Sequence, residues 1–346
     1  MRKGRTGEGG RVQSSLFSWR DKRSLGGLFA KIARGIGVDG MTVAEWFDAH
    51  RVSTPNRSLI AMLVRLTSYA DAPTRFCART AFRQLHGGII GGVEYLDRGW
   101  QQLVDQLAAA ARSAGVVIST RTTIDALTVR AGAPPTAGPH VVTGVKTRDG
   151  HTIRARAVVL AAGAPAAERL LSPWPSLCPS VARYLGQRVP ARVACFDAIL
   201  RDDLTRRSSS LVLGFDEPLY VSVHSDTAQL APPGHAVVHA MRYLAPGTAI
   251  DALTIRRQLE TTLHHLFPRP EIVRAVFRPN MTAMSDIPAS TPEGRRPAPL
   301  LAPGLFGVGD WVAAGDDSIL AEASFASARA VATQLAPDCS EKGRAA

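Results

Sequence analysis

Cysteine is scarce in this chain of 346 residues, which has only Cys77, Cys178, Cys195 and Cys339. The four lie far apart and form no Cys-x-x-Cys pair, so the sequence predicts neither a zinc site nor a disulfide framework. Isolated thiols are typical of a reducing compartment. We therefore expect a cytoplasmic protein without a bound metal.

Long apolar runs are missing as well, because no segment approaches the roughly 20 apolar residues that a membrane-spanning helix needs. The basic amino end, MRKGRTGEGG, is followed by no apolar stretch of signal-peptide length. A basic amphipathic helix is predicted further on, from apolar residues at helical spacing: Leu25, Leu28, Phe29, Ile32 and Ile36. Such a stripe more often packs into a core than contacts a membrane surface, and a peripheral membrane contact stays open.

Acidic residues are the minority charge, with 29 Asp+Glu against 41 Lys+Arg and a net charge of +12. This balance favours anionic small molecules or surfaces as partners. The basic residues are mostly arginines scattered along the chain, and no basic run is interleaved with aromatic residues. We therefore expect no nucleic-acid partner.

Residues 140–163 carry the first strong pattern. Apolar stretches at 141–145 and 152–155 flank Asp149-Gly150, which predicts a β-hairpin. The run AVVLAAG then reaches Gly163, which is typical of a buried strand that ends in a tight turn, and Pro165 favours a helix start.

Residues 303–335 carry the second strong pattern. The apolar run 305–308 is interrupted by Gly309-Asp310, and a helix rich in small residues is predicted to begin near Asp317 or Ser318. A strand, a turn and a helix start in this order place one carboxylate at the strand's carboxyl end, close to the unpaired N–H groups of the helix.

The rest of the sequence divides into a helical part and a strand-rich part. Before residue 113 we expect helices around 25–36, 45–47, 59–66, 74–85 and 95–113, with a glycine-dense break at 86–92. Strands are expected at 116–119 and 122–129. After a proline-rich crossing at 173–179, an antiparallel sheet with a helix at 251–267 is predicted from strands at 192–200, 211–215, 219–224, 236–243 and 273–277.

Taken in order, these motifs resemble those of two-dinucleotide-binding-domain flavoproteins, the superfamily of phytoene desaturases and flavin amine oxidases. The resemblance rests on the Gly309-Asp310 turn, the strand ending at Ala162-Gly163, where Ala162 replaces the usual Thr, and the Trp100-x-x-Leu103 helix followed by Gly115. It implies an α/β fold: a Rossmann-like FAD domain with an α+β substrate domain.

The resemblance also implies roles for particular residues in binding FAD. Asp310, after Gly309, would bind the ribityl or pyrophosphate part, and the turn at Ala162-Gly163 would lie near the cofactor. Ile124 would meet the adenine through its main chain, and Ser318-Ile319-Leu320 would lie against the pyrimidine edge of the flavin. The family's amino-terminal strand, G-x-G-x-x-G motif and helix have no counterpart here, so we expect an incomplete FAD domain and an amino-terminally truncated chain.

The predicted domain division follows from these patterns. Residues 1–92 would form a helical part of the substrate domain with a loose amino end, and 93–172 a part of the FAD domain. Residues 173–297 would hold the sheet of the substrate domain, and 298–346 would return to the FAD domain.

The implied activity is that of an FAD-dependent oxidoreductase that transfers a hydride from a small apolar substrate, isoprenoid or carotenoid-like, to the flavin. A flavin amine oxidase is one alternative, although five Trp and five Tyr hardly supply its aromatic cage. A non-catalytic isoprenoid-binding protein is the other. Tyr220 and Trp311 could line a flavin or a substrate, whereas Ser222, His224 and Asp226 lack the G-x-S-x-G context of a hydrolase triad.

Overall fold

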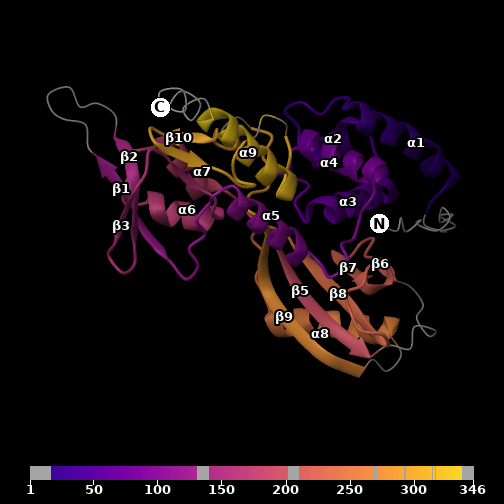
Figure 1. The fold of residues 1–346 in the computed structure, drawn as a ribbon. Helices are drawn as coiled ribbons and strands as arrows, with labels where there is room; N and C mark the ends of the chain where they lie inside the picture. The colour runs from indigo at the N-terminus through magenta and orange to yellow at the C-terminus, as the bar shows by residue number, and fades with distance from the viewer. Residues whose placement is uncertain are drawn as a thin grey trace.

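The computed structural model describes residues 17–130, 140–201, 210–267, 271–291, 294–313, 315 and 317–336. Most of the amino end that was predicted to be loose, with its glycines, lies outside these residues, as does Cys339. Figure 1 shows a helical unit at one end of the molecule, an α/β unit at the other and a curved sheet below them.

The helical unit consists of four helices: α1 (Trp19–Arg34), α2 (Val43–Ala49), α3 (Thr54–Ser68) and α4 (Ala78–Gly91). The predicted capping box is present, because the Thr42 hydroxyl accepts the Glu45 N–H and the Glu45 carboxylate accepts the Thr42 N–H. Trp46 and Ile60 are fully buried in the core of this unit. The apolar stripe of α1 packs into the same core through Leu28 and Ile32.

Two predictions in this half of the chain are wrong. The glycine-dense segment 86–92 is not a break, since α4 continues to Gly91 and the Gly92 N–H still donates to the Gly88 carbonyl. The expected strand at 116–119 does not form, and Val117 is 87% exposed. A strand needs a neighbour for its N–H and C=O groups, and this segment has no strand partner among the described residues. The preceding helix α5 (Gln101–Ser113) is also on the surface, with none of its residues buried.

The α/β unit brings together two remote parts of the chain. Its strands are β1 (Ile124–Arg130), β2 (Val141–Thr147), β3 (Thr152–Arg154), β4 (Val158–Leu160), β10 (Leu300–Ala302) and β11 (Leu305–Gly307). The predicted hairpin at Asp149-Gly150 joins β2 to β3, and β11 lies parallel to β4, with Gly307 opposite Leu160. Three helices complete the unit: α6 (Ala164–Leu171), α7 (Pro179–Gln187) and α9 (Leu320–Leu335).

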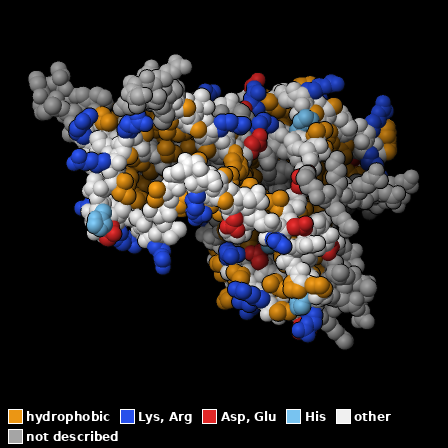
Figure 2. Space-filling view, viewed as in Figure 1, with side chains coloured by type: hydrophobic (Ala, Val, Ile, Leu, Met, Phe, Trp, Pro, Cys, Tyr) orange, Lys and Arg blue, Asp and Glu red, His pale blue; other side chains and the backbone are white. Residues whose placement is uncertain are grey.

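Apolar side chains are exposed on the face of the molecule that Figure 2 shows. Figure 2 shows them in the left half, in the region of β10, α7 and α6, with basic side chains around them. Beneath that surface, α6 and α7 share one core with β4 and β11. Helix α7 therefore packs with the α/β unit, whereas the predicted division placed it, with residues 173–297, in the substrate domain. That division stays a prediction.

The curved sheet is antiparallel and has the strand order β6-β7-β8-β5-β9. Its strands are β5 (Ala191–Arg201), β6 (Leu211–Leu213), β7 (Leu219–Val223), β8 (His235–Leu244) and β9 (Glu271–Met284). Helix α8 (Ala252–Leu266) packs on one face only, through Ile255, Leu259 and Leu263. This is the predicted arrangement of an antiparallel sheet with a helix on one side.

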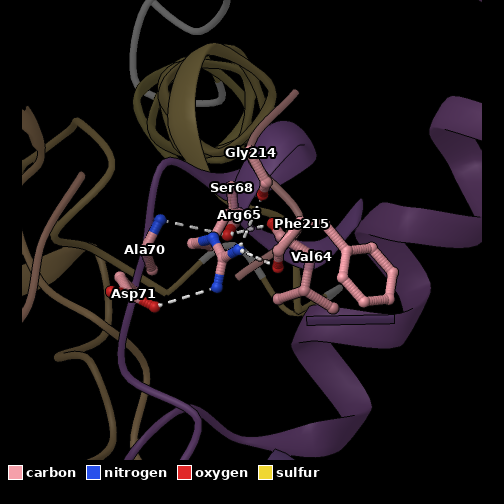
Figure 3. Close-up of polar contacts among 7 residues, drawn as sticks. All are labelled: Val64, Arg65, Ser68, Ala70, Asp71, Gly214 and Phe215. Atoms are coloured by element: carbon pink, nitrogen blue, oxygen red, sulfur yellow. Dashed lines mark hydrogen bonds and ion pairs between the residues drawn. The ribbon is translucent and has the colours of Figure 1, made fainter. Parts of the chain in front are cut away.

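A buried arginine joins the helical unit to the sheet (Figure 3). The Arg65 guanidinium of α3 donates to the carbonyls of Gly214 and Phe215 at 3.2 and 3.4 Å, and it pairs with Asp71 at 3.4 Å. Arg65 is 8% exposed, so its charge is held by one carboxylate and by carbonyl dipoles rather than by bulk water. The contact fixes the end of α3 against the loop between β6 and β7.

Candidate functional site

The two predicted turns lie at the same end of two neighbouring strands. Ala162-Gly163 follows β4 and Gly309-Asp310 follows β11, and the carboxyl ends of these parallel strands meet at one edge of the sheet. Between them lies a cavity of about 370 Å³. Most of its lining residues are small, and the full set is Ala161, Ala162, Gly163, Val308, Gly309, Asp310, Trp311, Ser324, Phe325 and Ala328.

Two hydrogen bonds hold the turns in place. The Trp311 indole N–H donates to the Ala162 carbonyl at 3.0 Å, which ties one turn to the other. The Gly309 N–H donates to the hydroxyl of buried Ser327 on α9 at 3.0 Å. Gly309 has φ +134°, and a Cβ there would lie 3.1 Å from the Trp311 ring, so glycine keeps this wall of the cavity flat.

Asp310 connects the cavity to the five-stranded sheet. Its Oδ2 atom accepts the N–H of Ser285, the residue after β9, at 2.7 Å, and its carbonyl accepts the Arg296 guanidinium at 3.1 Å. The carboxylate is therefore positioned by the backbone at the end of the five-stranded sheet. Sequence patterns identified the Gly309-Asp310 turn but gave no sign that Ser327 supports Gly309 or that Ser285 supports Asp310.

Next to Ser285 lies a buried acid that the sequence analysis missed. Asp286 is 1% exposed and accepts the Tyr184 hydroxyl at 3.0 Å and the Val189 N–H at 2.8 Å. Burial raises the pKa of Asp286, although these hydrogen bonds and the nearby Arg75 and Arg296 work against the rise. No local sequence signal marks this residue, because its partners lie about 100 positions away.

The structure does not bring the remaining predicted residues to this cavity. Ile124 begins β1 and packs against the core of the α/β unit. Helix α9 begins at Leu320 rather than near Asp317, and Ile319 is buried in the core of the helical unit. Ser318 is buried as well, and Leu320 packs against that same core.

The chain just before α9 is strained. Asp317 and Leu320 have φ values of +53° and +58°, a region that costs a side-chain-bearing residue about 1–2 kcal/mol. Two such residues within four positions persist because Ser318 and Ile319 between them are packed into the interior. The segment is thus fixed rather than loose, although it does not line the cavity. Asp316, also expected at this helix start, lies outside the described residues.

The relationship of this chain to known proteins follows from its match to a protein-family model. The model described as flavin containing amine oxidoreductase matches residues 15–336, which is most of the chain. The chain belongs to the flavin-containing amine oxidoreductase family. Membership in this family confirms the predicted relationship, the flavin cofactor, the enzyme class and the two-domain flavoprotein fold.

Solved structures share the family's fold at low sequence identity. An oxidoreductase from Methanosarcina mazei superposes with a TM-score of 0.68 at 18% identity, and the match covers 92% of this chain and 73% of that one. A Pyrococcus furiosus protein gives 0.62 at 14%, covering 91% and 73%. A triple mutant of putrescine oxidase, redesigned in cofactor binding, gives 0.61 at 14%, covering 94% and 77%. No curated protein matches the sequence.

The described residues fit part of a flavin cofactor of this family. Small side chains and Gly309 leave a flat wall, and the Asp310 carboxylate can accept a hydroxyl of a ribityl chain. None of the described lining residues is basic, so this cavity offers no side-chain cation to a pyrophosphate.

Two further kinds of feature are absent from the described residues. In the described ranges, no group of three or more His, Cys, Asp or Glu side chains could hold a metal ion. None of the helices there combines the length and the apolar character needed to cross a bilayer.

Proposed function

We propose that this chain binds FAD between the Ala162-Gly163 and Gly309-Asp310 turns and oxidises an elongated, largely apolar small molecule. The observation that supports this most is the meeting of two turns, about 150 residues apart in the chain, at one cavity. When bound there, FAD would accept a hydride from a substrate carbon. The chain's own residues would position the cofactor and keep water away.

In this proposal the acidic residue and the glycines of the two turns have different roles. Asp310, held by the Ser285 N–H, would accept hydroxyl groups of the ribityl chain, while Gly163 and Gly309 would let the cofactor approach the backbone. The proposed contacts with the adenine and with the pyrimidine edge of the flavin would be made by backbone atoms. Ile124 would make the first contact and Ser318-Ile319-Leu320 the second, where the side chains of Ile319 and Leu320 pack toward the interior.

The sheet face opposite α8 is the proposed place for the substrate. It begins next to Asp310, through Ser285, and its buried side chains there are Val193, Met241 and Tyr243. An apolar substrate, isoprenoid or carotenoid-like, would bind there mainly by burying its surface. A brief contact of the protein with a membrane that holds such a substrate belongs to the same proposal.

An amine substrate is the second candidate, and one observation favours it. Four of the five tyrosines, Tyr69, Tyr95, Tyr220 and Tyr243, lie near one another at this sheet face. Aromatic rings can surround a cationic amine. Because these tyrosines cluster, a small number of aromatic residues could still form the cage that an amine substrate needs.

Reduction of the flavin by a named substrate tests both candidates. Protein loaded with FAD would be mixed anaerobically with an isoprenoid hydrocarbon or with putrescine, and the yellow flavin absorbance followed. Bleaching by the hydrocarbon supports the leading proposal, and bleaching by putrescine alone supports the amine. A protein that retains the hydrocarbon but never bleaches would contradict both and support a non-catalytic binding role.

A further inference from the structure

A second cavity lies where three parts of the chain meet. Its volume is about 260 Å³, and none of the described residues lines both this cavity and the cofactor cavity. One contribution comes from the loop between α3 and α4, another from α7 with the residue after it, and the third from the segment that follows β9. The lining residues are Arg75, Tyr184, Gln187, Arg188, Asp286, Ala289, Thr291 and Gly294.

This cavity has a buried inner end and an exposed mouth. Tyr184 and Asp286 are buried, whereas Gln187 and Thr291 are exposed. A Cβ at Gly294 would lie 2.5 Å from the Cβ of Ala289, so glycine is needed for the close approach of the chain there. Pockets for drug-sized ligands measure about 300–1,000 Å³, so this one has room for a smaller molecule that enters from solvent.

The Arg75 guanidinium is the least satisfied polar group of this cavity. Among the described residues, its one polar side-chain contact is an ion pair of 3.7 Å between Nη2 and Oδ1 of Asp286. That distance is longer than a hydrogen bond. The Arg75 Nε–H is shielded from solvent and has no acceptor in the described part of the chain. Because buried donors nearly always have an acceptor, a ligand in the cavity would supply a missing partner.

The nearby carboxylate does not fill this role, because other donors hold it. Asp286 Oδ2 accepts the Tyr184 hydroxyl at 3.0 Å, and Oδ1 accepts the Val189 N–H at 2.8 Å. Asp286 is therefore oriented by α7 and by the chain just before β5. The N–H donors of Arg75 remain available to an acceptor that enters the cavity.

Arg188 brings a second guanidinium to the same cavity from the α/β unit. Its Nη1 donates to the Glu168 carboxylate at 2.6 Å and to the Leu185 carbonyl. Its Nε and Nη2 have no acceptor among the residues that the structure describes. Two guanidinium groups with unused donors therefore line one small space.

The charges in and around the cavity favour an anion. Two arginines and one aspartate line it, while Glu168, the partner of Arg188, is half-exposed and is not among the lining residues. A third guanidinium, that of Arg296, is close enough to act on both Tyr184 and Asp286. The cavity thus has an excess of positive charge that comes from identified side chains.

We propose that this cavity binds a small oxyanion, a phosphate or a dicarboxylate, between the guanidinium groups of Arg75 and Arg188. The planar fork of a guanidinium matches two oxygens of such a group. The Gln187 amide and the Thr291 hydroxyl at the mouth can donate to further oxygens. The site is separate from the cofactor cavity, so the inference does not depend on the proposed function.

A bound oxyanion would join two units of the molecule. Arg75 belongs to the helical unit and Arg188 follows α7 of the α/β unit. The ligand would also lie beside Asp286, the residue after Ser285, whose N–H orients the Asp310 carboxylate of the cofactor cavity. Because the ligand binds only where these parts meet, it should stabilise the folded chain.

Calorimetric titration of the full chain with inorganic phosphate and with malonate tests the inference. Both titrations are run at neutral pH and constant ionic strength, with chloride as the competing anion. We expect saturable binding of at least one of the two ions at one site, and a melting temperature that rises with its concentration. The ion that binds shows whether the site takes a phosphate or a dicarboxylate.

Matched variants locate the binding. Arg75→Gln and Arg188→Gln should each weaken it by about tenfold or more, because each removes charge-assisted hydrogen bonds. Arg112→Gln, on the exposed helix α5, makes the same change in net charge and should leave the affinity unchanged. The melting temperature of each variant without ligand shows whether it is folded. Arg188→Gln loses a half-exposed partner, so it serves if Arg75→Gln does not fold.

Three outcomes would overturn the inference. The first is that neither ion binds, and the second is that Arg75→Gln and Arg188→Gln bind no more weakly than Arg112→Gln, since binding would then follow net charge alone. The third is competition between phosphate and FAD, because the phosphate would then occupy the cofactor site. Phosphate binding at this cavity by a chain that binds no FAD would contradict the proposed function and leave this inference standing.

Discussion

One face of the five-stranded sheet packs on α8 through Phe196 and Leu200, whereas the other presents Cys195 and Asp197 from the same strand. Because strand side chains alternate, β5 serves both faces with adjacent residues. The α8 face is uniformly apolar, and the opposite face combines tyrosines, histidines and charges. The difference shows that one face is a purely apolar core, whereas the other buries polar and aromatic side chains such as Tyr243 together with apolar ones.

The largest expected effect comes from opening a cavity on the apolar face. Leu259 is fully buried between α8 and the sheet, so Leu259→Ala should lower the free energy of unfolding by about 2–5 kcal/mol. Tyr220→Phe, on the opposite face, should cost less than about 1 kcal/mol. Urea unfolding of both variants measures this contrast, and equal losses would break the distinction between the faces.

The second effect concerns Ser327, a buried polar residue outside the five-stranded sheet that we expect to contribute to the free energy of unfolding. The hydroxyl of buried Ser327 accepts the Gly309 N–H and donates within α9, so Ser327→Ala would leave that N–H unsatisfied. We expect a loss of about 1–3 kcal/mol. Ser324→Ala on the same helix, where the hydroxyl bonds only its own turn, is the control. Equal stability of the two variants would argue against this support of the turn.

The third effect is a pH dependence that belongs to the polar face. His224 has a folded pKa of about 4 against an ordinary value of 6.5, so the unfolded chain binds the proton first as the pH falls. Its contribution to stability is full above about pH 6.5 and is lost toward pH 4. His224→Gln should flatten this slope by less than about 1.4 kcal/mol per pH unit, since the ring is only half-buried.

The same pH titration distinguishes the contribution of His224 to stability from that of Asp197. Burial works to raise the pKa of Asp197, but His239 and Arg278 outweigh it and the pKa is lowered. The stability that Asp197 contributes is therefore lost only as the pH falls below its ordinary value of 3.8. Denaturation curves between pH 7 and pH 4 that are identical for wild type and His224→Gln would contradict the assignment.

The smallest effect concerns an unsatisfied hydroxyl on the polar face. Tyr243 is 3% exposed, and its hydroxyl has no hydrogen-bond partner among the described residues. Removing an unpaired buried polar group is neutral or stabilising, so Tyr243→Phe should change stability by less than about 1 kcal/mol. A substantial loss on thermal unfolding would show that the hydroxyl has a partner in solution.

Local sequence patterns predicted the elements that depend on local chemistry. The Asp149-Gly150 hairpin, the capping box at Thr42 and the Gly309-Asp310 turn all follow from a few adjacent residues, and the structure has all three. The meeting of that turn with Gly163 could be expected only through the family resemblance, because nothing local pairs β4 with β11.

Features set by long-range pairing could not be predicted in the same way. Segment 116–119 has the composition of a strand but no strand beside it in the described part of the chain. Asp197 and His239 are 42 residues apart, and only the register of β5 and β8 places them opposite each other. No local pattern in the sequence could therefore pair this histidine with this carboxylate.

Direct titration of the chain with FAD, followed by the fluorescence of the flavin, tests the central claim that the two turns form the cofactor site. Asp310→Asn is compared with Asp105→Asn, a control on the exposed helix α5. The account predicts saturable binding that Asp310→Asn weakens by about tenfold or more, as expected for a lost charge-assisted hydrogen bond, and that Asp105→Asn leaves unchanged. Equal affinity in wild type and Asp310→Asn would contradict it.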